Sequence, residues 1–560
     1  TPLPEPTPEE PQLKLTPITT ISGPPDHALG FRNAQEQAVP QVLPLGTGGE
    51  YPKGLTGTLY TIGPGTYDIS YSRQGEFGAV TRTYSFGHWF DHLPLVNRFA
   101  FNSEDQSVTY NSRLTAKPLQ DKIQMQHGYT SRLSGGLYST DTNQSIFTKF
   151  MGSSKKKAKN PEKEICSGNI VANFPWPGGK DSLVCLSHVA HVQRLDSDSL
   201  HPTQLALWEE MDYSFAGSQF CPHVLHDPTT KQTFTFAMDI GYRSTNFHVY
   251  AVRTNVADGP ITTEIASFPA YPSLVHSFSL TPNYVVVAAS PMCSATTGFR
   301  FSMNNNLLDS FHFSKADPTL IYVISRKEHR LVVVYQSESM FSFHHINAFE
   351  DDTDNIYLDL VAYPDSTLLR QLTLPHLRNT QGPVVLPRPE IRRYLLANVQ
   401  DEAKRNPHPS YRGTDLPTAH FSTPAKSGVE LPRINPLFER RSYRYVYGVG
   451  HVAAQPHGLW NALCKVDMLR EQDTLYWSEE GCLPGEAVFV PRQDSSLAEA
   501  QENSSEDHGY LLSVVFDSVN TKSFLLVLDA TSLKEVARYA LPHVVPLAFG
   551  HGSFSANKPS

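Results

Sequence analysis

The chain has 560 residues, of which 39% are hydrophobic and 11% aromatic, enough to bury a large core. Its net charge of −9 lacks the basic footprint of a nucleic-acid-binding protein. No run of 18 apolar residues occurs, so the sequence predicts no transmembrane helix.

The six cysteines are scattered along the chain and form no CxxC pair. This spacing argues against a zinc ribbon or a disulfide framework and favours reduced thiols. We therefore expect a cytoplasmic protein, either free in the cytosol or bound peripherally to a membrane.

Residues 1–27 are rich in Pro and Glu and predict an extended arm, followed by a single domain over residues 28–560. In that domain, short segments rich in Val, Ile, Tyr, Phe and Thr recur between Gly, Pro, Asn and Asp residues. The clearest of them are 57–63, 233–239, 284–290, 319–325, 331–337, 356–363, 443–449, 511–516 and 523–530. Many short strands of this kind predict an all-β fold, either a sandwich, a barrel or a propeller.

Helical periodicity is rare, and the best two candidates are residues 204–215 and 390–405. Three stretches of irregular or strongly charged sequence predict surface insertions, at 153–163, 403–428 and 493–507. No repeat of fixed length is visible, so the blades of a propeller would differ from one another in sequence.

Four histidines stand beside strand-like sequence, in the segments FCPHVLHDP, PSLVHSFSLTP, FSFHHINAFED and PLAFGHGSF. They are His223, His276, His344 and His551. Neutral imidazole is the commonest protein ligand for transition metals. Four such ligands from four distant strands require a fold that brings these strands to one axis, which favours a metal at the centre of a β-propeller.

Other motifs accompany the histidine segments: HWFDHLPLVNRFAF at 88–101, VELPRINPLFERRSYRYVYG at 429–448 and GEAVFVPR at 485–492. Together these segments resemble the carotenoid cleavage oxygenase family, which includes the retinoid isomerase of the visual cycle. The resemblance extends from about residue 50 to residue 555. It implies a seven-bladed β-propeller, with a dome of loops and helices over the face that bears the metal.

The resemblance also implies one Fe(II) ion per chain, held by His223, His276, His344 and His551, with O2 as co-substrate. In HVLHDP, His223 rather than His226 stands four residues before the Asp. In HHINA, His344 rather than His345 stands three residues before the Asn.

In this family, glutamates accept hydrogen bonds from the second ring nitrogen of the ligand histidines. Two residues match this pattern, Glu430 behind His344 and Glu486 behind His551. A third glutamate is expected about 30 residues before the first ligand, where this chain has His188. Either His188 replaces the carboxylate as the partner of His276, or Glu209 serves instead.

The function implied is dioxygenase cleavage of a C=C double bond in a carotenoid or apocarotenoid, which yields two carbonyl products. Oxidative cleavage of a stilbene or phenylpropene, and isomerohydrolysis of a retinyl ester, remain alternatives. A propeller that serves only as an interaction module, and zinc or copper in place of iron, are also compatible with the residues. No GxSxG, HExxH or P-loop motif supports a hydrolase or nucleotide-binding reading.

A carotenoid must be drawn from a bilayer, and residues 292–313 carry Phe299, Phe301, Leu307, Leu308 and Phe311 in a loop-like context. An exposed apolar rim of this kind would dip into the membrane interface without spanning it. Packing of the same side chains into the protein core is the alternative. Trp89, Phe86 and Phe278 are candidate walls of the substrate pocket.

Overall fold

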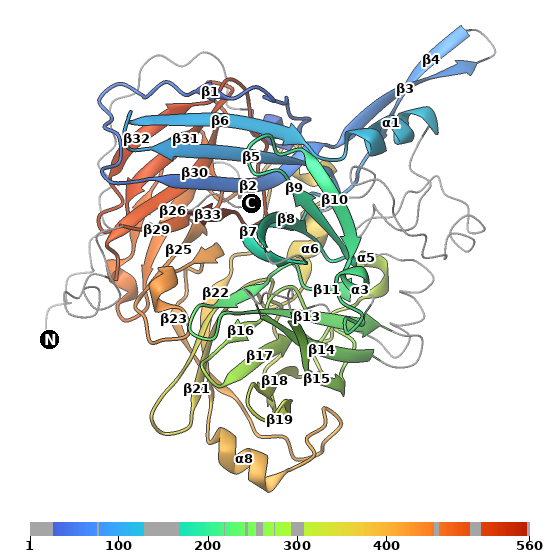
Figure 1. The fold of residues 1–560 in the computed structure, drawn as a ribbon, viewed down its shortest axis with the longest axis vertical. Coiled ribbons are helices and arrows are strands. Elements are labelled where there is room, and N and C mark those ends of the chain that lie inside the picture. Colours follow the sequence, from blue (N-terminus) through green and yellow to red (C-terminus); the bar gives the residue numbers. More distant parts are fainter. Residues whose placement is uncertain are drawn as a thin grey trace, which may run out of the picture.

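The computed structural model describes residues 26–75, 78–127, 167–177, 180–217, 219–240, 245–253, 261–273, 275–292, 307–452, 458–492 and 506–556. These residues form seven antiparallel sheets of four or five strands and one separate two-stranded hairpin. The seven sheets are the blades of a β-propeller (Figure 1), which confirms the predicted fold class.

The blades follow one another along the chain, and we number them in that order. Blade 1 contains β1 (Gln41–Val42), β2 (Gly57–Thr66), β5 (Leu93–Asn102), β6 (Ser107–Leu114) and β33 (Ser553–Ser555). Blade 2 contains β7 (Asn169–Trp176), β8 (Lys180–Leu186), β9 (His191–Leu195) and β10 (Pro202–Leu207). Blade 3 contains β11 (Gln219–Phe220), β12 (Leu225–Asp227), β13 (Gln232–Ile240), β14 (Thr245–Arg253) and β15 (Ile261–Pro269). Blade 4 contains β16 (Ser279–Leu280), β17 (Tyr284–Ala289), β18 (Thr319–Ser325) and β19 (Arg330–Ser337).

Blade 5 contains β20 (His345–Glu350), β21 (Ile356–Ala362), β22 (Glu390–Leu396) and β23 (His420–Ala425). Blade 6 contains β24 (Glu430–Arg433), β25 (Tyr445–Gly450), β26 (Ala462–Asp467) and β27 (Leu475–Trp477). Blade 7 contains β28 (Cys482–Pro484), β29 (Val488–Pro491), β30 (Gly509–Asp517), β31 (Lys522–Asp529) and β32 (Glu535–Ala540). The separate hairpin, β3 (Asp68–Gly75) with β4 (Gly78–Ser85), projects from the body of the protein (Figure 1).

The helices are short. They are α1 (Lys117–Met125), α3 (Trp208–Met211), α5 (Leu307–Ser310), α6 (Thr367–Gln371), α7 (Leu374–Leu377) and α8 (Val399–Arg405), with 3-10 helices η1 (His27–Phe31), η2 (Pro436–Phe438) and η3 (Glu471–Asp473). The loop before β5 is tied to α6 and α7, because Trp89 N–H donates to the Leu372 carbonyl and Leu374 N–H donates to the Gly87 carbonyl.

The last strand closes the ring of blades. β33 pairs antiparallel with β2, with Thr58 opposite Ser555 and Tyr60 opposite Ser553. Just before β33, the backbone N–H of His551 donates to Oδ1 of Asn169 at 2.8 Å, which links the closure to the first strand of blade 2. The closure therefore fixes the backbone position of His551.

Continuous apolar runs form the middle strands because adjacent blades cover both faces of each sheet. All seven residues of β18 are buried, and five of the six residues of β17 are buried. β-branched residues such as Val286 and Ile321 suit this environment, since their stiff side chains pack well on a pleated surface.

The two predicted helices are largely wrong. Residues 204–207 continue strand β10, and only Trp208–Met211 are helical. Residues 390–396 form β22, and the helix α8 begins after Asn398, whose φ of 56° breaks the strand. In both segments, pairing with a neighbouring strand outweighs the weak local preference for helix.

Several predicted surface features lie mostly outside the described residues: the arm over residues 1–25, the insertion at 153–163, residues 293–306 and residues 493–505. Within the expected membrane rim, Phe311 is buried at 2% exposure and Leu308 packs against the core, so neither belongs to an exposed rim. None of the described helices has the length and hydropathy needed to span a bilayer.

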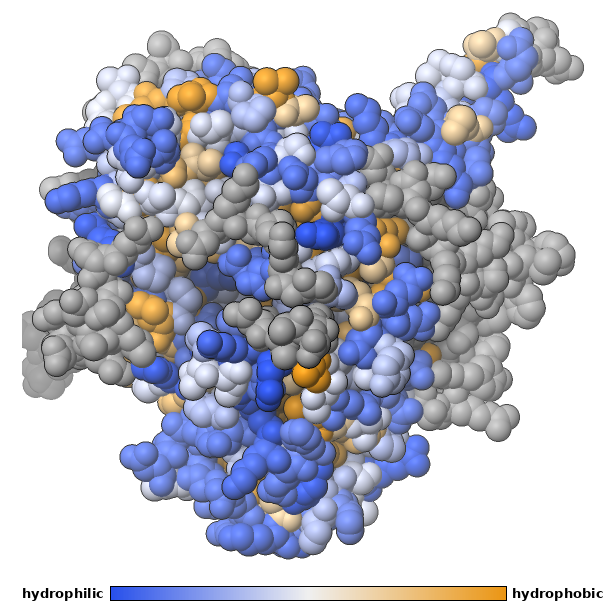
Figure 2. Space-filling view, viewed as in Figure 1, coloured by the Kyte–Doolittle hydropathy of each residue, from blue (hydrophilic) through white to orange (hydrophobic). Residues whose placement is uncertain are grey.

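Hydrophilic residues cover most of the described surface that faces the viewer in Figure 2, and hydrophobic residues gather in small separate patches. Val39, Val42 and Leu45, around β1, are among the exposed apolar side chains. Cys221, Cys464 and Cys482 are buried and form no disulfide bond among the described residues, and the expectation of reduced thiols stays a prediction.

We predict that Gly57→Ala weakens the closure. Gly57 has a φ of 138°, and a Cβ there would lie 2.6 Å from the Ser555 carbonyl oxygen. Gly54, with a φ of 75° and open space around it, is the matched control. Gly57→Ala should lower the free energy of unfolding by about 2 kcal/mol more than Gly54→Ala, measured by denaturant titration. Equal losses in the two variants would contradict this account of the closure.

Candidate metal centre

The structure brings the four predicted histidines together near the propeller axis. His223 lies between β11 and β12, His276 precedes β16, His344 immediately precedes β20, and His551 precedes β33. Each histidine therefore stands just before a strand of a different blade. For His551 this strand is β33, which closes the ring, and for the other three it is a short strand at the beginning of the blade. This topology explains why residues up to 328 positions apart in the chain share one site.

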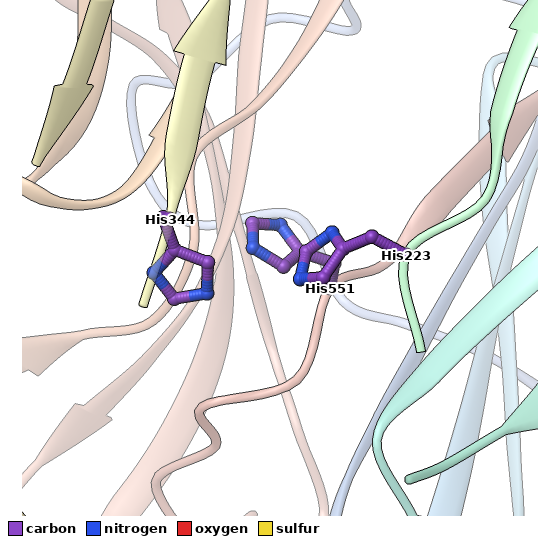
Figure 3. A group of neighbouring side chains, drawn as sticks. All are labelled: His223, His344 and His551. Atoms are coloured by element: carbon purple, nitrogen blue, oxygen red, sulfur yellow. The ribbon is translucent and has the colours of Figure 1, made fainter. Parts of the chain in front are cut away.

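His223, His344 and His551 offer ring nitrogens that all lie within 4.8 Å of one another, and Figure 3 shows the three rings converging from separate segments. His276 stands beside them. Its ring centre lies 4.9 Å from that of His223 and 5.1 Å from that of His344. The four rings thus enclose one small space.

The Nε2 atoms of all four rings are buried and have no hydrogen-bond partner among the described residues. Unpaired buried polar atoms are rare, because each carries a desolvation cost, and four beside one another need a common explanation. A cation with an affinity for imidazole would satisfy all four at once. The donor set therefore fits a transition-metal ion.

The opposite nitrogen, Nδ1, is engaged in three of the four rings. His344 Nδ1 lies 2.6 Å from Oε2 of Glu430, His551 Nδ1 contacts Oε1 of Glu486, and His276 Nδ1 lies 2.8 Å from Nε2 of His188. A partner at Nδ1 that accepts a proton leaves the lone pair on Nε2, which is the form that binds a metal. The hydrogen-bond pattern thus favours a ligand role for Nε2.

Glu430 is held from three sides. Its side chain is fully buried and accepts hydrogen bonds from Tyr363 OH at 2.9 Å and from the Leu431 backbone N–H at 2.9 Å, besides facing His344. These donors compensate a buried carboxylate and fix its orientation.

Glu486 is paired with a cation. Arg433 Nε donates to Oε1 of Glu486 at 2.6 Å, and the same guanidinium donates to the Gly552 carbonyl at 2.6 Å. Burial alone would raise the pKa of Glu486, but Arg433 and His551 outweigh this effect and bring the pKa to about 2. The carboxylate is therefore ionised at neutral pH and anchors the segment that carries His551.

The imidazoles of His223, His276 and His551 are neutral at physiological pH. Burial, and to a lesser extent the neighbouring imidazoles, hold the pKa values of His223 and His276 well below the usual range. Burial lowers the pKa of His551 to about 4, although Glu486 raises it. Neutral rings are ready to bind a cation without releasing a proton.

The structure separates His226 and His345, the histidines near His223 and His344 in the sequence, from the centre. His226 is exposed, and its Nδ1 lies 3.2 Å from Thr233 Oγ1. Nδ1 of His345 lies 2.9 Å from Ser279 Oγ. Glu209 is exposed on α3, whereas His188 is buried and contacts His276, so His188 occupies the place that was left open between the two.

An aromatic wall, formed by Trp89, Phe90, Phe343, Trp460 and Phe549, lies against the histidines. The Phe343 ring centre is 5.7 Å from that of His276, and the Phe549 ring centre is 5.4 Å from that of His344. Phe90 packs 4.9 Å from Phe549, and Trp460 packs 5.7 Å from Phe549. The wall makes the surroundings of the centre apolar and dry.

Of the aromatic residues expected at the pocket, Trp89 belongs to this wall, while Phe86 and Phe278 pack elsewhere in the core. The sequence reasoning missed Phe343 and Phe549, although each stands one or two residues before a ligand candidate, which is a signal that could have found them. Trp460 carried no such signal.

Comparison with known proteins agrees with the observed fold. The model of the family described as retinal pigment epithelial membrane protein matches residues 30–556, so the chain belongs to this family. The result confirms the resemblance inferred from the sequence motifs.

Three relatives cover most of the chain. A carotenoid dioxygenase of Neurospora crassa is 26% identical over 90% of this chain and 87% of its own length. A torulene dioxygenase of Gibberella fujikuroi is 27% identical over 90% and 89%, and the β,β-carotene 15,15'-dioxygenase of Homo sapiens is 26% identical over 90% and 91%.

Among solved structures, cobalt-substituted Synechocystis ACO is similar, with a TM-score of 0.72 and 20% identity over 95% of this chain and 98% of that one. An ACO/RPE65 chimera is similar with the same TM-score, identity and coverage. At this identity, the likeness establishes the fold.

We predict that, in the metal-free protein, Glu486 stabilises the folded chain at neutral pH and that this stabilisation is lost in acid. Its folded pKa of about 2 lies below the ordinary value of 4.5, so ionised Glu486 stabilises the folded chain above about pH 4.5 and this contribution is lost as the pH falls towards 2. Denaturant titrations should show Glu486→Gln to be less stable than the unmodified chain at pH 6, with a smaller difference at pH 3. Glu480→Gln, at an exposed site, is the control. A pH-independent difference would contradict the assignment.

Proposed function

We propose that this chain is an Fe(II)-dependent dioxygenase that cleaves a C=C double bond of a carotenoid or apocarotenoid with O2 and releases two carbonyl products. One observation carries the proposal, namely that four neighbouring imidazole rings each have a buried Nε2 atom without a hydrogen-bond partner among the described residues. The relatives named carotenoid dioxygenase and torulene dioxygenase support the choice of reaction.

In the proposed site, His223, His276, His344 and His551 hold one iron ion through Nε2. Imidazole also binds zinc and copper, but zinc does not exchange electrons, so a reaction with O2 at this site requires iron or copper. The cobalt-substituted relative shows that a related protein accepts a divalent transition metal. Bound Fe(II) would supply the electrons that let O2 react with a closed-shell olefin.

The residues behind the ligands orient them. Glu430 and Glu486 accept the Nδ1 protons of His344 and His551, and His188 accepts that of His276. Each partner holds one tautomer and one ring orientation, so that Nε2 points to the metal before the metal arrives. Removing a residue that hydrogen-bonds to a metal ligand commonly lowers metal affinity 10- to 100-fold.

The aromatic wall has two roles. Trp89, Phe90, Phe343, Trp460 and Phe549 offer flat apolar surfaces on which a conjugated chain can lie. They also keep bulk water away from the centre, which limits side reactions of the reacting groups with water. Contact with a membrane through residues 292–313, as the source of the apolar substrate, remains a prediction.

The test is anaerobic metal analysis combined with an O2-dependent product assay on β-carotene, an apocarotenal, resveratrol and isoeugenol. One iron per chain and carbonyl products from a carotenoid or apocarotenoid are expected. Products from resveratrol or isoeugenol alone would instead place the chain among stilbene or phenylpropene cleavers. Iron without oxidative cleavage would call for an assay of retinyl ester isomerohydrolysis. A chain without metal, or a His276→Ala variant with full iron content and turnover, would refute the site.

A second prediction concerns His188. His188→Leu removes the acceptor for His276 Nδ1 and should weaken Co²⁺ binding about 10- to 100-fold, whereas His188→Glu offers a carboxylate and should bind Co²⁺ at least as tightly as the unmodified protein. Affinity is measured from the visible absorption of bound Co²⁺ during anaerobic titration. The exposed His226 provides the control, because His226→Leu should leave the affinity unchanged. A His188→Leu variant with unchanged affinity would show that His188 does not position the ligand.

A further inference from the structure

A small cavity of about 40 Å³ lies between blades 7 and 1, beside the segment that closes the ring. One face of each bordering strand lines it, since alternate residues of a strand point to the same side. These residues are Leu59, Thr61 and Gly63 of β2, and Leu512, Val514 and Phe516 of β30. Residues 545–548 and Gly550, in the segment that leads to His551, complete much of the lining.

Small side chains explain why this space is not filled. Sheets that pack face to face normally close the gap between them with interdigitating side chains. Gly63 has no side chain to contribute, and a Cβ at this position would lie 2.6 Å from Cβ of Ala548. The closing segment therefore lies against the bare backbone of β2, and a space remains beside Thr61 and Val514.

The polar side chains on the lining already have partners. Asn97 Nδ2 donates to Thr61 Oγ1 at 3.2 Å, and Asn97 Oδ1 accepts from Tyr110 OH at 3.0 Å. Glu486 Oε2 accepts from the Gly552 backbone N–H at 2.7 Å. Within the described chain, no buried side-chain N or O atom of the lining residues lacks a hydrogen-bond partner. A buried water typically makes about three hydrogen bonds, so this lining favours an apolar occupant over water.

The size of the cavity selects a very small molecule. A water molecule takes up about 30 Å³ in the liquid, whereas pockets for larger organic ligands begin at about 300 Å³. The olefin is therefore too large for this cavity. Apolar cavities stay dry and take up apolar species such as xenon. Dioxygen has a suitable size and is apolar, so it leaves water for surroundings of this kind.

The cavity reaches the residues that support one proposed metal ligand. Glu486 and Gly550 both line it, and His551 directly follows Gly550 and contacts Glu486 through Nδ1. The lining includes no residue of the aromatic wall, although every residue of that wall is described. A molecule in the cavity would thus lie close to the centre without taking space from an olefin on the wall.

We propose that this cavity takes up dioxygen and holds it beside the metal centre, apart from the surface on which the olefin lies. The inference rests on the proposed function, in which O2 is the co-substrate. Apolar walls concentrate O2 relative to water, and a separate cavity allows the olefin to fill the aromatic side without excluding the second substrate.

The first test uses dioxygen itself on the metal-free protein. Dioxygen is paramagnetic and speeds the relaxation of nearby methyl groups, which NMR measures on protein with 13C-labelled Leu and Val methyl groups. Spectra under O2 pressure are compared with spectra under N2 at the same pressure. The methyl groups of Leu59, Leu512, Val514 and Val545 should show a larger enhancement than those of Val323, which is buried in blade 4.

Two substitutions at Val514 change the cavity in opposite directions. Val514→Phe fills it and should abolish the enhancement at Leu512 and Val545, whereas Val514→Ala enlarges it and should retain the enhancement. Val536 is a second partly buried valine of blade 7 and does not line the cavity. Val536→Phe is therefore the matched control and should leave the enhancement unchanged.

The second test is kinetic and uses the iron-loaded enzyme. Val514→Phe should raise the KM for O2 about threefold or more, and this rise should exceed any change in kcat or in the KM for the olefin. Val536→Phe should leave the KM for O2 unchanged.

Equal enhancement at the cavity methyl groups and at Val323 would overturn the proposal. So would an unchanged KM for O2 in a Val514→Phe variant that no longer takes up dioxygen. Failure of the oxygenase assay would refute the proposed function alone, because the NMR measurement needs neither iron nor turnover.

Discussion

Four imidazole nitrogens that are buried without a partner constrain the rest of the structure. A chain tolerates such a group only when something compensates its desolvation, and a bound cation does so for all four at once. The propeller provides the geometry, because the first strands of its blades converge and each ligand needs only to stand where the chain enters one of them. The closing pair of β33 with β2 completes the centre, since His551 belongs to the segment that closes the ring.

The residues that hydrogen-bond to Nδ1 of the proposed ligands differ in chemistry. Glu430 and Glu486 are carboxylates with several donors each, whereas His188 is a neutral ring that accepts one proton and must donate another. Arg433 supplies a counter-charge to Glu486.

The surroundings of the centre consist of aromatic surfaces and a few polar atoms without hydrogen-bond partners among the described residues. The aromatic wall suits a long conjugated chain because it offers a large flat apolar contact area. Contact area alone does not distinguish one polyene from another. Discrimination requires polar atoms that lose their partners with the wrong ligand.

The sequence by itself predicted the all-β fold class, the four histidines as candidate metal ligands and the two glutamates as their hydrogen-bond partners. These predictions rest on local signals, namely short β-branched runs and polar residues set in apolar strand segments. It misassigned residues 204–207 and 390–396, where strand pairing across the sheet decides against a local helical pattern. Whether His188 or Glu209 stands behind His276 was open in the sequence, and only the tertiary structure, in which His188 contacts His276 across 88 positions of the chain, decided it. The aromatic wall likewise depends on contacts between residues hundreds of positions apart, such as Trp89 with Phe549. Spacing along a chain specifies neighbours within a strand or turn, but the closed ring of blades determines which strands meet at its axis.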